Sequence, residues 1–327
     1  MAGVTSEDFE LRTEPFRPEL LVHCYRMLGS IHDAEDLVQD TLVRAWRAFD
    51  RYDEKRASLR TWLYRIATNT CLNALESRKR RPLPTGLVGP GEDPEAPLVR
   101  GEEVPWLQPF PDGLMRTDPS DPATVVAERG SLRLALIAAM QYLPAKQRAV
   151  LILRDVLDWS AAEVAEALEI SPAAVNSALQ RARAKLADAA VGEDDVLESD
   201  DPACRAMVDQ YIEAFERADV MAFSKLLAED VILEMPPFLN WFAGRENHLR
   251  FVARVFELRG TDWRVFPLAA NGQPGIAVYR GDGTGVHHVH TLHVFTITKA
   301  GITHNRVFQD AGVFAAFGLA PELPSQE

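Results

Sequence analysis

The chain has 327 residues, too many for one ordinary hydrophobic core, and 47% of them are apolar, so two or three packed domains are expected. No apolar stretch is long enough to span a bilayer, and residues 1–12 lack the apolar stretch of a signal peptide. The three cysteines lie far apart without metal-ligand spacing, which favours reduced core thiols in a cytoplasmic protein and indicates neither a metal site nor a cofactor.

Charge is distributed unevenly along the chain. The net charge of −13 speaks against a nucleic-acid partner, because DNA binding depends on neutralising phosphates. Basic residues are nevertheless concentrated in two short stretches, Arg78–Arg81 and Arg181–Lys185, while acidic residues pool in Glu92–Glu103 and Glu193–Asp201. The acidic balance lowers the odds of DNA binding without excluding it.

Hydrophobic periodicity predicts a first helical domain over residues 9–81. Apolar residues at steps of three and four, from Ala34 through Trp46 to Phe49, predict an amphipathic helix with Asp33 as its N-cap. Polar side chains lie away from that stripe: Asp36, Gln39, Asp40, Arg44 and Arg47.

A second helix is predicted to begin near Ser58, with an apolar stripe from Leu59 to Leu75. Its remaining face is polar and partly basic, and aromatic residues lie near its start. Basic groups attract phosphates, amides can read base edges, and aromatics can stack on unpaired bases. The residues concerned are Trp62, Tyr64, Arg65, Asn69, Asn73 and Arg80. On these residues alone, a solvated face with core aromatics is favoured over a nucleic-acid site.

Residues 82–122 contain ten prolines, which excludes a regular helix or a central strand and predicts an extended linker. Within it, Pro105–Phe110 is more apolar than a free tether requires. Packing against another domain and a plain tether with incidental aromatics are both open interpretations.

Residues 123–190 are predicted to form a second all-α domain that contains a helix-turn-helix. Ser160 and Glu163 fit a capping box at the start of one helix, and Ser171 followed by Pro172 is typical of the start of the next. Because the second helix is basic, insertion into a DNA major groove is favoured over a structural helical hairpin. Its polar positions are Ser171, Asn176, Ser177, Gln180, Arg181, Arg183 and Lys185.

Residues 201–322 are predicted to form an α+β domain, a curved sheet wrapped around helices. The expected helices are Cys204–Arg217, Met221–Leu227 and Gly244–Leu258, and the expected strands are Val231–Met235, Trp263–Ala270, Ile276–Arg280, His287–Thr298 and Ile302–Gln309.

Several titratable residues of this domain are candidates for acid-base chemistry: Asp230, His248, Asp262, His288, His290 and His293. Alternation along a strand places His288 and His290 on one face and His293 on the other, so the three are not expected to line one pocket. Histidines in strands are more often structural than catalytic, and no catalytic residue is assigned.

Taken together, the helical segments resemble the sigma-70 family of RNA polymerase sigma factors, of the extracytoplasmic-function type. Asp33–Trp46 resembles region 2.2, and Arg60–Asn69 followed by Arg78–Arg81 resembles regions 2.3 and 2.4. Leu143–Arg148 with the helix-turn-helix resembles region 4. The resemblance covers most of residues 9–190, and three motifs in the right order make it specific.

This resemblance implies a protein, not an enzyme, that binds core RNA polymerase and directs recognition and melting of promoter DNA. In such factors region 2.2 docks on the largest polymerase subunit, here through Asp36, Gln39, Asp40 and Arg44. Regions 2.3 and 2.4 capture the −10 element, here through Trp62, Tyr64, Arg65, Asn69, Asn73 and Arg80. Region 4 reads the −35 duplex, here through Ser171, Asn176, Ser177, Gln180, Arg181, Arg183 and Lys185. Many relatives have arginines where this chain has Asn176 and Ala178.

The third domain is similar to the SnoaL-like polyketide-cyclase family, on Leu226–Pro237, Phe242–Arg245 and the order of its elements. The similarity implies a pocket, and a regulatory domain that binds a small molecule is favoured over a catalytic one. For the linker, the resemblance to sigma factors adds a third interpretation, passage through a polymerase channel. A ligand-responsive repressor and an enzyme with helical appendages are the rival readings, and neither explains the first helical segment.

Overall fold

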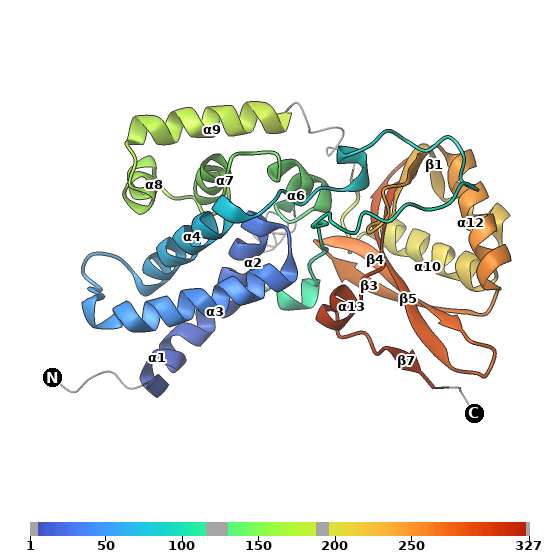
Figure 1. The fold of residues 1–327 in the computed structure, drawn as a ribbon, viewed down its shortest axis with the longest axis horizontal. Helices are drawn as coiled ribbons and strands as arrows, with labels where there is room; N and C mark the ends of the chain where they lie inside the picture. The colour runs from blue at the N-terminus through green and yellow to red at the C-terminus, as the bar shows by residue number, and fades with distance from the viewer. Residues whose placement is uncertain (1–5, 116–129, 188–195, 325–327) are drawn as a thin grey trace. The chain divides into compact units, whose positions relative to one another are not determined.

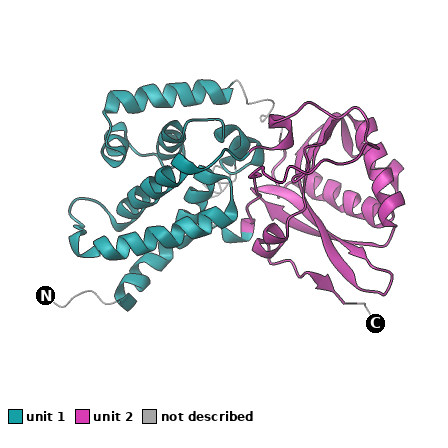
Figure 2. Cartoon of the chain, in the orientation of Figure 1, with its two compact units in different colours: residues 1–81, 113–191 teal, residues 82–112, 192–327 magenta. Residues whose placement is uncertain are grey.

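The computed structural model describes residues 6–115, 130–187 and 196–324. The chain divides into two compact units, residues 1–81 with 113–191 and residues 82–112 with 192–327 (Figure 2). The expected division at residues 122 and 123 lies outside the described residues. None of the described helices combines the length and the apolar character needed to cross a membrane.

The first unit is entirely helical in its described part (Figure 1). Its α-helices are α1 Ser6–Thr13, α2 Arg17–Leu28, α3 Ile31–Ala48, α4 Leu59–Ser77, α6 Leu134–Met140, α7 Ala145–Leu151, α8 Ala161–Leu168 and α9 Pro172–Ala187.

Local sequence signals set the bounds of α2, α3 and α4. Gly29 has a positive φ of 68° directly after α2, a conformation that glycine adopts without a Cβ clash. The side chain of Ser30 then caps α3 by accepting a hydrogen bond from the Asp33 amide, and Ser58 caps α4 in the same way. The prediction that Asp33 caps α3 was therefore wrong, because the helix begins at Ile31, three residues earlier than that cap implies.

A buried arginine joins the helices of the first unit. Arg148 of α7 donates hydrogen bonds to the Met27 carbonyl of α2, to the Gln141 side chain and carbonyl, and to the Leu143 carbonyl. Burial lowers the pKa of Arg148 to about 10. Removing this guanidinium would leave several buried carbonyls without a donor.

The helix-turn-helix has the predicted caps. Ser160 and Glu163 form a complete capping box at the start of α8. Glu169 adopts a left-handed conformation in the turn, and the Ser171 hydroxyl accepts a hydrogen bond from the Ala174 amide at the start of α9.

The second unit is a curved mixed sheet with helices packed on it (Figure 1). Its helices are α10 Pro202–Glu216, α11 Val220–Phe223, α12 Arg245–Arg259 and α13 Ala311–Ala316. Its strands are β1 Leu227–Glu234, β2 Trp241–Ala243, β3 Trp263–Ala270, β4 Gln273–Gly281, β5 His287–Thr298, β6 Gly301–Phe308 and β7 Glu322–Leu323.

The strands follow the order β2-β1-β6-β5-β4-β3, with β7 paired to β5. Strands β1 and β6 are parallel, and the other pairs are antiparallel. A core of aromatic and aliphatic side chains fills the space between α10, α12 and the sheet, with Tyr211, Phe223 and Phe295 completely buried at its centre.

The proline-rich segment 82–112 packs on this α+β domain. Backbone hydrogen bonds join Gly91 to Trp241 and Leu239 to Val99. At the end of the segment, Phe110 exchanges hydrogen bonds with Asn271. Leu107 and Phe110 of the apolar run are fully buried, so the structure favours the packed interpretation over a plain tether.

Candidate functional site

One exposed face of α3 combines polar and apolar side chains. Asp36, Gln39, Asp40 and Arg44 are all exposed. Val43 and Trp46 lie among them with 47% and 40% of their surface exposed, although the sequence pattern placed Trp46 in the buried stripe. Large apolar side chains with a polar surround are typical of a protein contact. We call these six residues the α3 face.

The predicted DNA-melting residues of α4, with Arg80 just after its last residue Ser77, divide into exposed and buried positions. Asn73 and Arg80 are exposed, and Trp62, Arg65 and Asn69 are partly exposed. The Trp62 ring packs against the rings of neighbouring aromatics, 4.9 Å from that of Tyr52. We call Trp62, Arg65, Asn69, Asn73 and Arg80 the α4 face.

Tyr64 is a correction to the predicted site. Its side chain is 2% exposed, its hydroxyl donates to Glu19 at 3.2 Å, and the Arg60 guanidinium lies over its ring. Burial raises the pKa of Tyr64 well above its usual value. Position 64 points toward α2, where its hydroxyl meets Glu19 and its ring packs 5.1 Å from that of His23, so Tyr64 is a core residue here.

Helix α8 covers part of the α4 face. The Arg65 guanidinium lies 3.5 Å from the Glu166 carboxylate, and the Asn69 amide donates to the Ala167 carbonyl at 3.4 Å. Trp62 and Arg65 line a cavity of about 440 Å³ together with Trp159 of the second helical segment. The sequence did not predict this contact, because no local pattern reports packing between segments about 100 residues apart.

The same cavity is lined by basic residues that the sequence analysis missed, Arg51 and Arg56 in the loop before α4. Their only sequence signal is their position next to the aromatic start of that helix.

Two arginines of the basic stretch at the end of α4 are already paired. Arg78 and Arg81 lie 2.6 Å and 2.5 Å from the Asp33 carboxylate. Arg80 lies over the Tyr142 ring, 4.1 Å from its centroid, a cation–π contact. The stretch therefore presents less free positive charge than its sequence indicates.

Helix α9 presents its amides and one arginine on an exposed face. Asn176, Gln180 and Arg181 are exposed, and Ser177 is partly exposed. Arg183 is held by Asp155 at 2.9 Å and 2.7 Å, and that carboxylate raises the Arg183 pKa.

Other polar positions of α9 have structural partners. The Lys185 ammonium donates to the Tyr142 carbonyl at 2.7 Å, and Ser171 is the N-cap. Ala178 is buried, so a long basic side chain does not fit there. We call Asn176, Ser177, Gln180 and Arg181 the α9 face.

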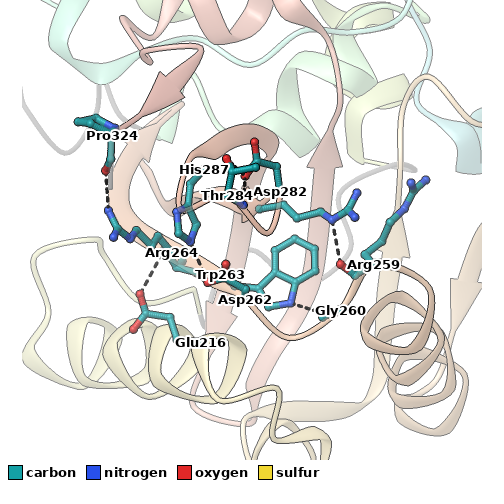
Figure 3. Close-up of polar contacts among 12 residues, drawn as sticks. Glu216, Arg259, Gly260, Asp262, Trp263, Arg264, Asp282, Thr284, His287 and Pro324 are labelled. Carbon is teal, nitrogen blue, oxygen red and sulfur yellow. Dashed lines mark hydrogen bonds and ion pairs between the residues drawn. The ribbon is translucent and has the colours of Figure 1, made fainter. Parts of the chain in front are cut away.

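Three of the six candidate acid-base residues of the α+β domain, Asp230, Asp262 and His288, have separate environments. Asp262 and His287 point toward one another, with 2.9 Å between the carboxylate and Nε2 (Figure 3). His288 is exposed and contacts Asp282 and Glu322. Asp230 is exposed on β1.

His248, His290 and His293, by contrast, line a single cavity of about 350 Å³. The expectation from alternation placed His290 with His288, which was wrong. Val278 pairs with Thr291 and Tyr279 with Val289, so His290 is an extra residue in β5. This β-bulge reverses the alternation and brings His290 to the face of His293.

Burial holds these three histidines neutral near pH 7. Desolvation lowers the pKa of His248 to about 4, of His290 to about 4, and of His293 to about 3. A neutral imidazole offers one donor and one acceptor and carries no charge.

Among the described residues, no histidine, cysteine and carboxylate side chains are grouped as a metal site would require. Cys24, Cys71 and Cys204 are buried and free of disulfides.

Comparison with known proteins accounts for each part of this architecture. Residues 13–81 match Sigma-70 region 2, residues 133–186 match Sigma-70 region 4, and residues 208–312 match a SnoaL-like domain. Together these parts define a promoter-recognition subunit of RNA polymerase that carries an additional α+β domain. Over 318 residues the chain is 48% identical to the ECF RNA polymerase sigma factor SigG of Mycobacterium tuberculosis H37Rv, covering 97% of this chain and 85% of the relative. The chain belongs to the ECF RNA polymerase sigma factors.

Two further similarities concern SigJ of the same organism. The ECF RNA polymerase sigma factor SigJ is 29% identical over 256 residues, covering 76% of this chain and 73% of the relative. The crystal structure of SigJ has a TM-score of 0.63 and 20% identity, covering 95% of this chain and 99% of that one. This match shows that the two chains share a fold.

The ECF RNA polymerase sigma factor SigW of Bacillus subtilis is 30% identical over 171 residues, or 52% of this chain. This chain acts in transcription initiation as a sigma factor, and its SnoaL-like domain follows the two sigma regions.

Proposed function

We propose that the α3 face, the α4 face and the α9 face are the surfaces through which this sigma factor binds core RNA polymerase and promoter DNA. The α3 face binds the polymerase. Its exposed Val43 and Trp46, surrounded by Asp36, Asp40 and other polar side chains, are the observation that supports this role.

The α4 face contacts the separated strand of the −10 element. Trp62 provides a stacking surface, and Arg65 attracts the phosphate backbone. Asn69 and Asn73 provide amides for base edges, and Arg80 a further positive charge. Tyr64 supports these residues from the core and is not part of the surface.

The α9 face reads the −35 duplex. Asn176, Gln180 and Arg181 contact base edges or phosphates in the major groove, with Ser177 beside them. Arg183, Lys185 and Ser171 hold the helix in place through the contacts described above.

Binding both elements at once requires α4 and α8 to separate. The −10 and −35 elements lie about 25 base pairs apart, or about 85 Å along the helix axis, whereas packed helices lie about 10 Å apart. The Arg65–Glu166 ion pair is largely exposed, and exposed pairs contribute at most about 1 kcal/mol. The compact first unit is therefore a closed state, and opening it breaks this exposed pair together with the buried hydrogen bond from Arg148 to the Met27 carbonyl.

The SnoaL-like domain regulates rather than catalyses. Its cavity histidines are neutral, the described residues that line the cavity include no carboxylate, and the domain holds the segment that connects the two sigma regions. The domain acts on initiation through that segment, in the cytoplasm where polymerase works.

Reversing one charge on the α3 face tests the polymerase contact. Asp40→Lys should weaken binding to core polymerase at least about tenfold, which corresponds to about 1.4 kcal/mol, and reduce transcription from a cognate promoter in the same proportion. Glu76→Lys, an equal charge change at an exposed position of α4, is the matched control. Equal binding by both variants would exclude the α3 face as the polymerase contact.

A further inference from the structure

The cavity of the α+β domain has no role in promoter recognition. It lies between α10, α12 and the inner face of β1, β5 and β6, has a volume of about 350 Å³, and is lined mainly by aliphatic and aromatic side chains such as Phe215, Leu233 and Phe251. A partly enclosed apolar space of this size is typical of a site for a small organic molecule.

Several polar atoms at this cavity have no hydrogen-bond partner. Both ring nitrogens of His248 are buried and unpaired, and this side chain is completely inaccessible to solvent. Nδ1 of His290 is also buried without a partner. Buried polar atoms without partners are unfavourable and uncommon in native proteins, so their clustering at one cavity indicates that a bound molecule supplies the missing partners.

The lining also sets the charge of that molecule. No aspartate or glutamate is among the described lining residues, so a cationic ligand would lack a counter-ion. The imidazoles at the cavity carry no charge, so they can donate to an oxygen but cannot neutralise an anion. Two arginines also line the cavity, Arg254 and Arg259. Arg254 uses Nη1 to bind the carbonyls of Pro94 and Ala96, both at 2.7 Å. The lining therefore disfavours a cation and accepts an uncharged or an anionic molecule.

One wall of the cavity belongs to the segment between the two sigma regions. Leu98 lines the cavity. The adjacent residue Val99 is bound to the α+β domain from both sides, because its amide donates to Asn240 and its carbonyl accepts from the Leu239 amide. The Gly101 amide donates to the Pro237 carbonyl nearby. A molecule in the cavity would contact Leu98, and this contact would restrict the segment that connects region 2 to region 4.

We propose that this cavity binds a mainly apolar small molecule without positive charge through a carbonyl or hydroxyl oxygen at His248, and that its occupancy tightens segment 82–112 around Leu98. The binding site stands independently of promoter recognition. Its effect on the segment rests on the proposed regulatory function of the domain.

The neutral naphthyl ketone Prodan, whose emission shifts to the blue in apolar surroundings, is the probe. The full chain should bind it saturably at one site. In His248→Phe the dissociation constant should rise about tenfold, because an apolar ring of similar size replaces the hydrogen-bonding group. His304→Phe is the matched control: His304 is a partly buried histidine of the same sheet that does not line the cavity, and its substitution should leave Prodan binding unchanged.

A competitor pair tests the role of the oxygen in the unaltered protein. The ketone 2-acetylnaphthalene should displace Prodan about tenfold more effectively than 2-ethylnaphthalene, which has the same shape without the carbonyl. Equal displacement would refute recognition of an oxygen, and the absence of saturable Prodan binding would refute the site.

Amide hydrogen exchange tests the coupling to the segment. With Prodan bound, the Val99 and Gly101 amides should exchange at least about threefold more slowly, while the Phe110 amide, held by Asn271 elsewhere on the domain, should not change. If the Val99 amide exchanges at an unaltered rate when Prodan saturates the site, the coupling to the segment is refuted and the binding site is not. Transcription by the unaltered chain from a cognate promoter is measured without Prodan, so failure of the promoter function is seen separately in that assay.

Discussion

At the scale of single residues, burial decides which side chains of α4 can meet DNA. Trp62 and Tyr64 are both aromatic and lie two positions apart, which puts them on different sides of the helix. Trp62 stays partly exposed, whereas Tyr64 is fixed in the core by its hydrogen bond to Glu19. The sequence predicts that aromatics start this helix, but periodicity alone did not separate these two.

Substitution of each aromatic should therefore have a different effect on promoter opening. Trp62→Ala removes a stacking surface and should reduce opening by at least about tenfold, since stacking contributes about 1–3 kcal/mol per base. Tyr64→Phe removes only a buried hydroxyl and should leave opening by the holoenzyme within about twofold of wild type. Fluorescence of 2-aminopurine in the −10 element measures both, and equal losses would place Tyr64 back on the surface.

The buried histidines make the α+β domain sensitive to acid. Their pKa values are lowered to about 4 for His248 and His290 and to about 3 for His293, so below pH 6.5 the unfolded chain binds protons that the folded chain does not. The free energy of unfolding should then fall as pH falls from about 6.5 to about 4, by up to about 1.4 kcal/mol per pH unit for each histidine.

Urea unfolding of the full chain at pH 7 and pH 5 measures this loss. His248→Phe should lose less stability than wild type between the two pH values, because one group that takes up a proton on unfolding is absent. Identical losses would mean that His248 is protonated in the folded chain.

At the scale of secondary structure, the elements with strong local signals are those that the sequence predicts. The capping box at Ser160 and the Ser171–Pro172 start fix α8 and α9 as expected, and the strand predicted over Trp263–Ala270 is confirmed as β3. Short elements without periodicity were missed, namely the three-residue β2, the short α13 and the two-residue β7. The bulge at His290 was missed because register depends on the partner strand, which a single sequence does not show.

The pairing of α9 side chains predicts unequal contributions to −35 recognition. Arg181→Ala should weaken holoenzyme binding to promoter duplex about tenfold, consistent with about 1–3 kcal/mol for a good base contact. Arg183→Ala is the matched control, and its effect should stay under about threefold because Asp155 already holds that guanidinium. A larger loss from Arg183→Ala, measured by fluorescence anisotropy, would show that Arg183 leaves Asp155 to bind DNA.

At the scale of the whole molecule, the chain order and the compact units do not coincide. Segment 82–112 lies between the two sigma regions in sequence, yet it packs with residues 192–327 (Figure 2). Its composition predicted an irregular connection. The apolar residues Leu107 and Phe110, which are buried in the structure, were the local feature of the sequence that indicated packing. Its specific partners, such as Asn271 and Glu234, could not be read from the sequence because they lie far along the chain.

Deletion of residues 201–327 should therefore release the segment and alter initiation. Limited proteolysis should cut within residues 82–112 of the truncated chain but not of the full chain, and promoter output with core polymerase should change by at least about threefold. Unchanged promoter output from the truncated chain would refute the regulatory role of the SnoaL-like domain. The proposal for the promoter-reading surfaces of the two sigma regions would be unaffected.

The attachment of segment 82–112 near both of its ends also limits how far apart the two sigma regions can travel. Fully extended, about 30 residues span about 100 Å, enough for the distance between promoter elements, but Thr85 is held by Glu234 and Asp112 accepts from Gly272. Each contact that opens lengthens the usable tether and dilutes region 4 around its DNA site, since local concentration falls with tether length. The number of intact contacts would thus set which spacer lengths between promoter elements the factor tolerates.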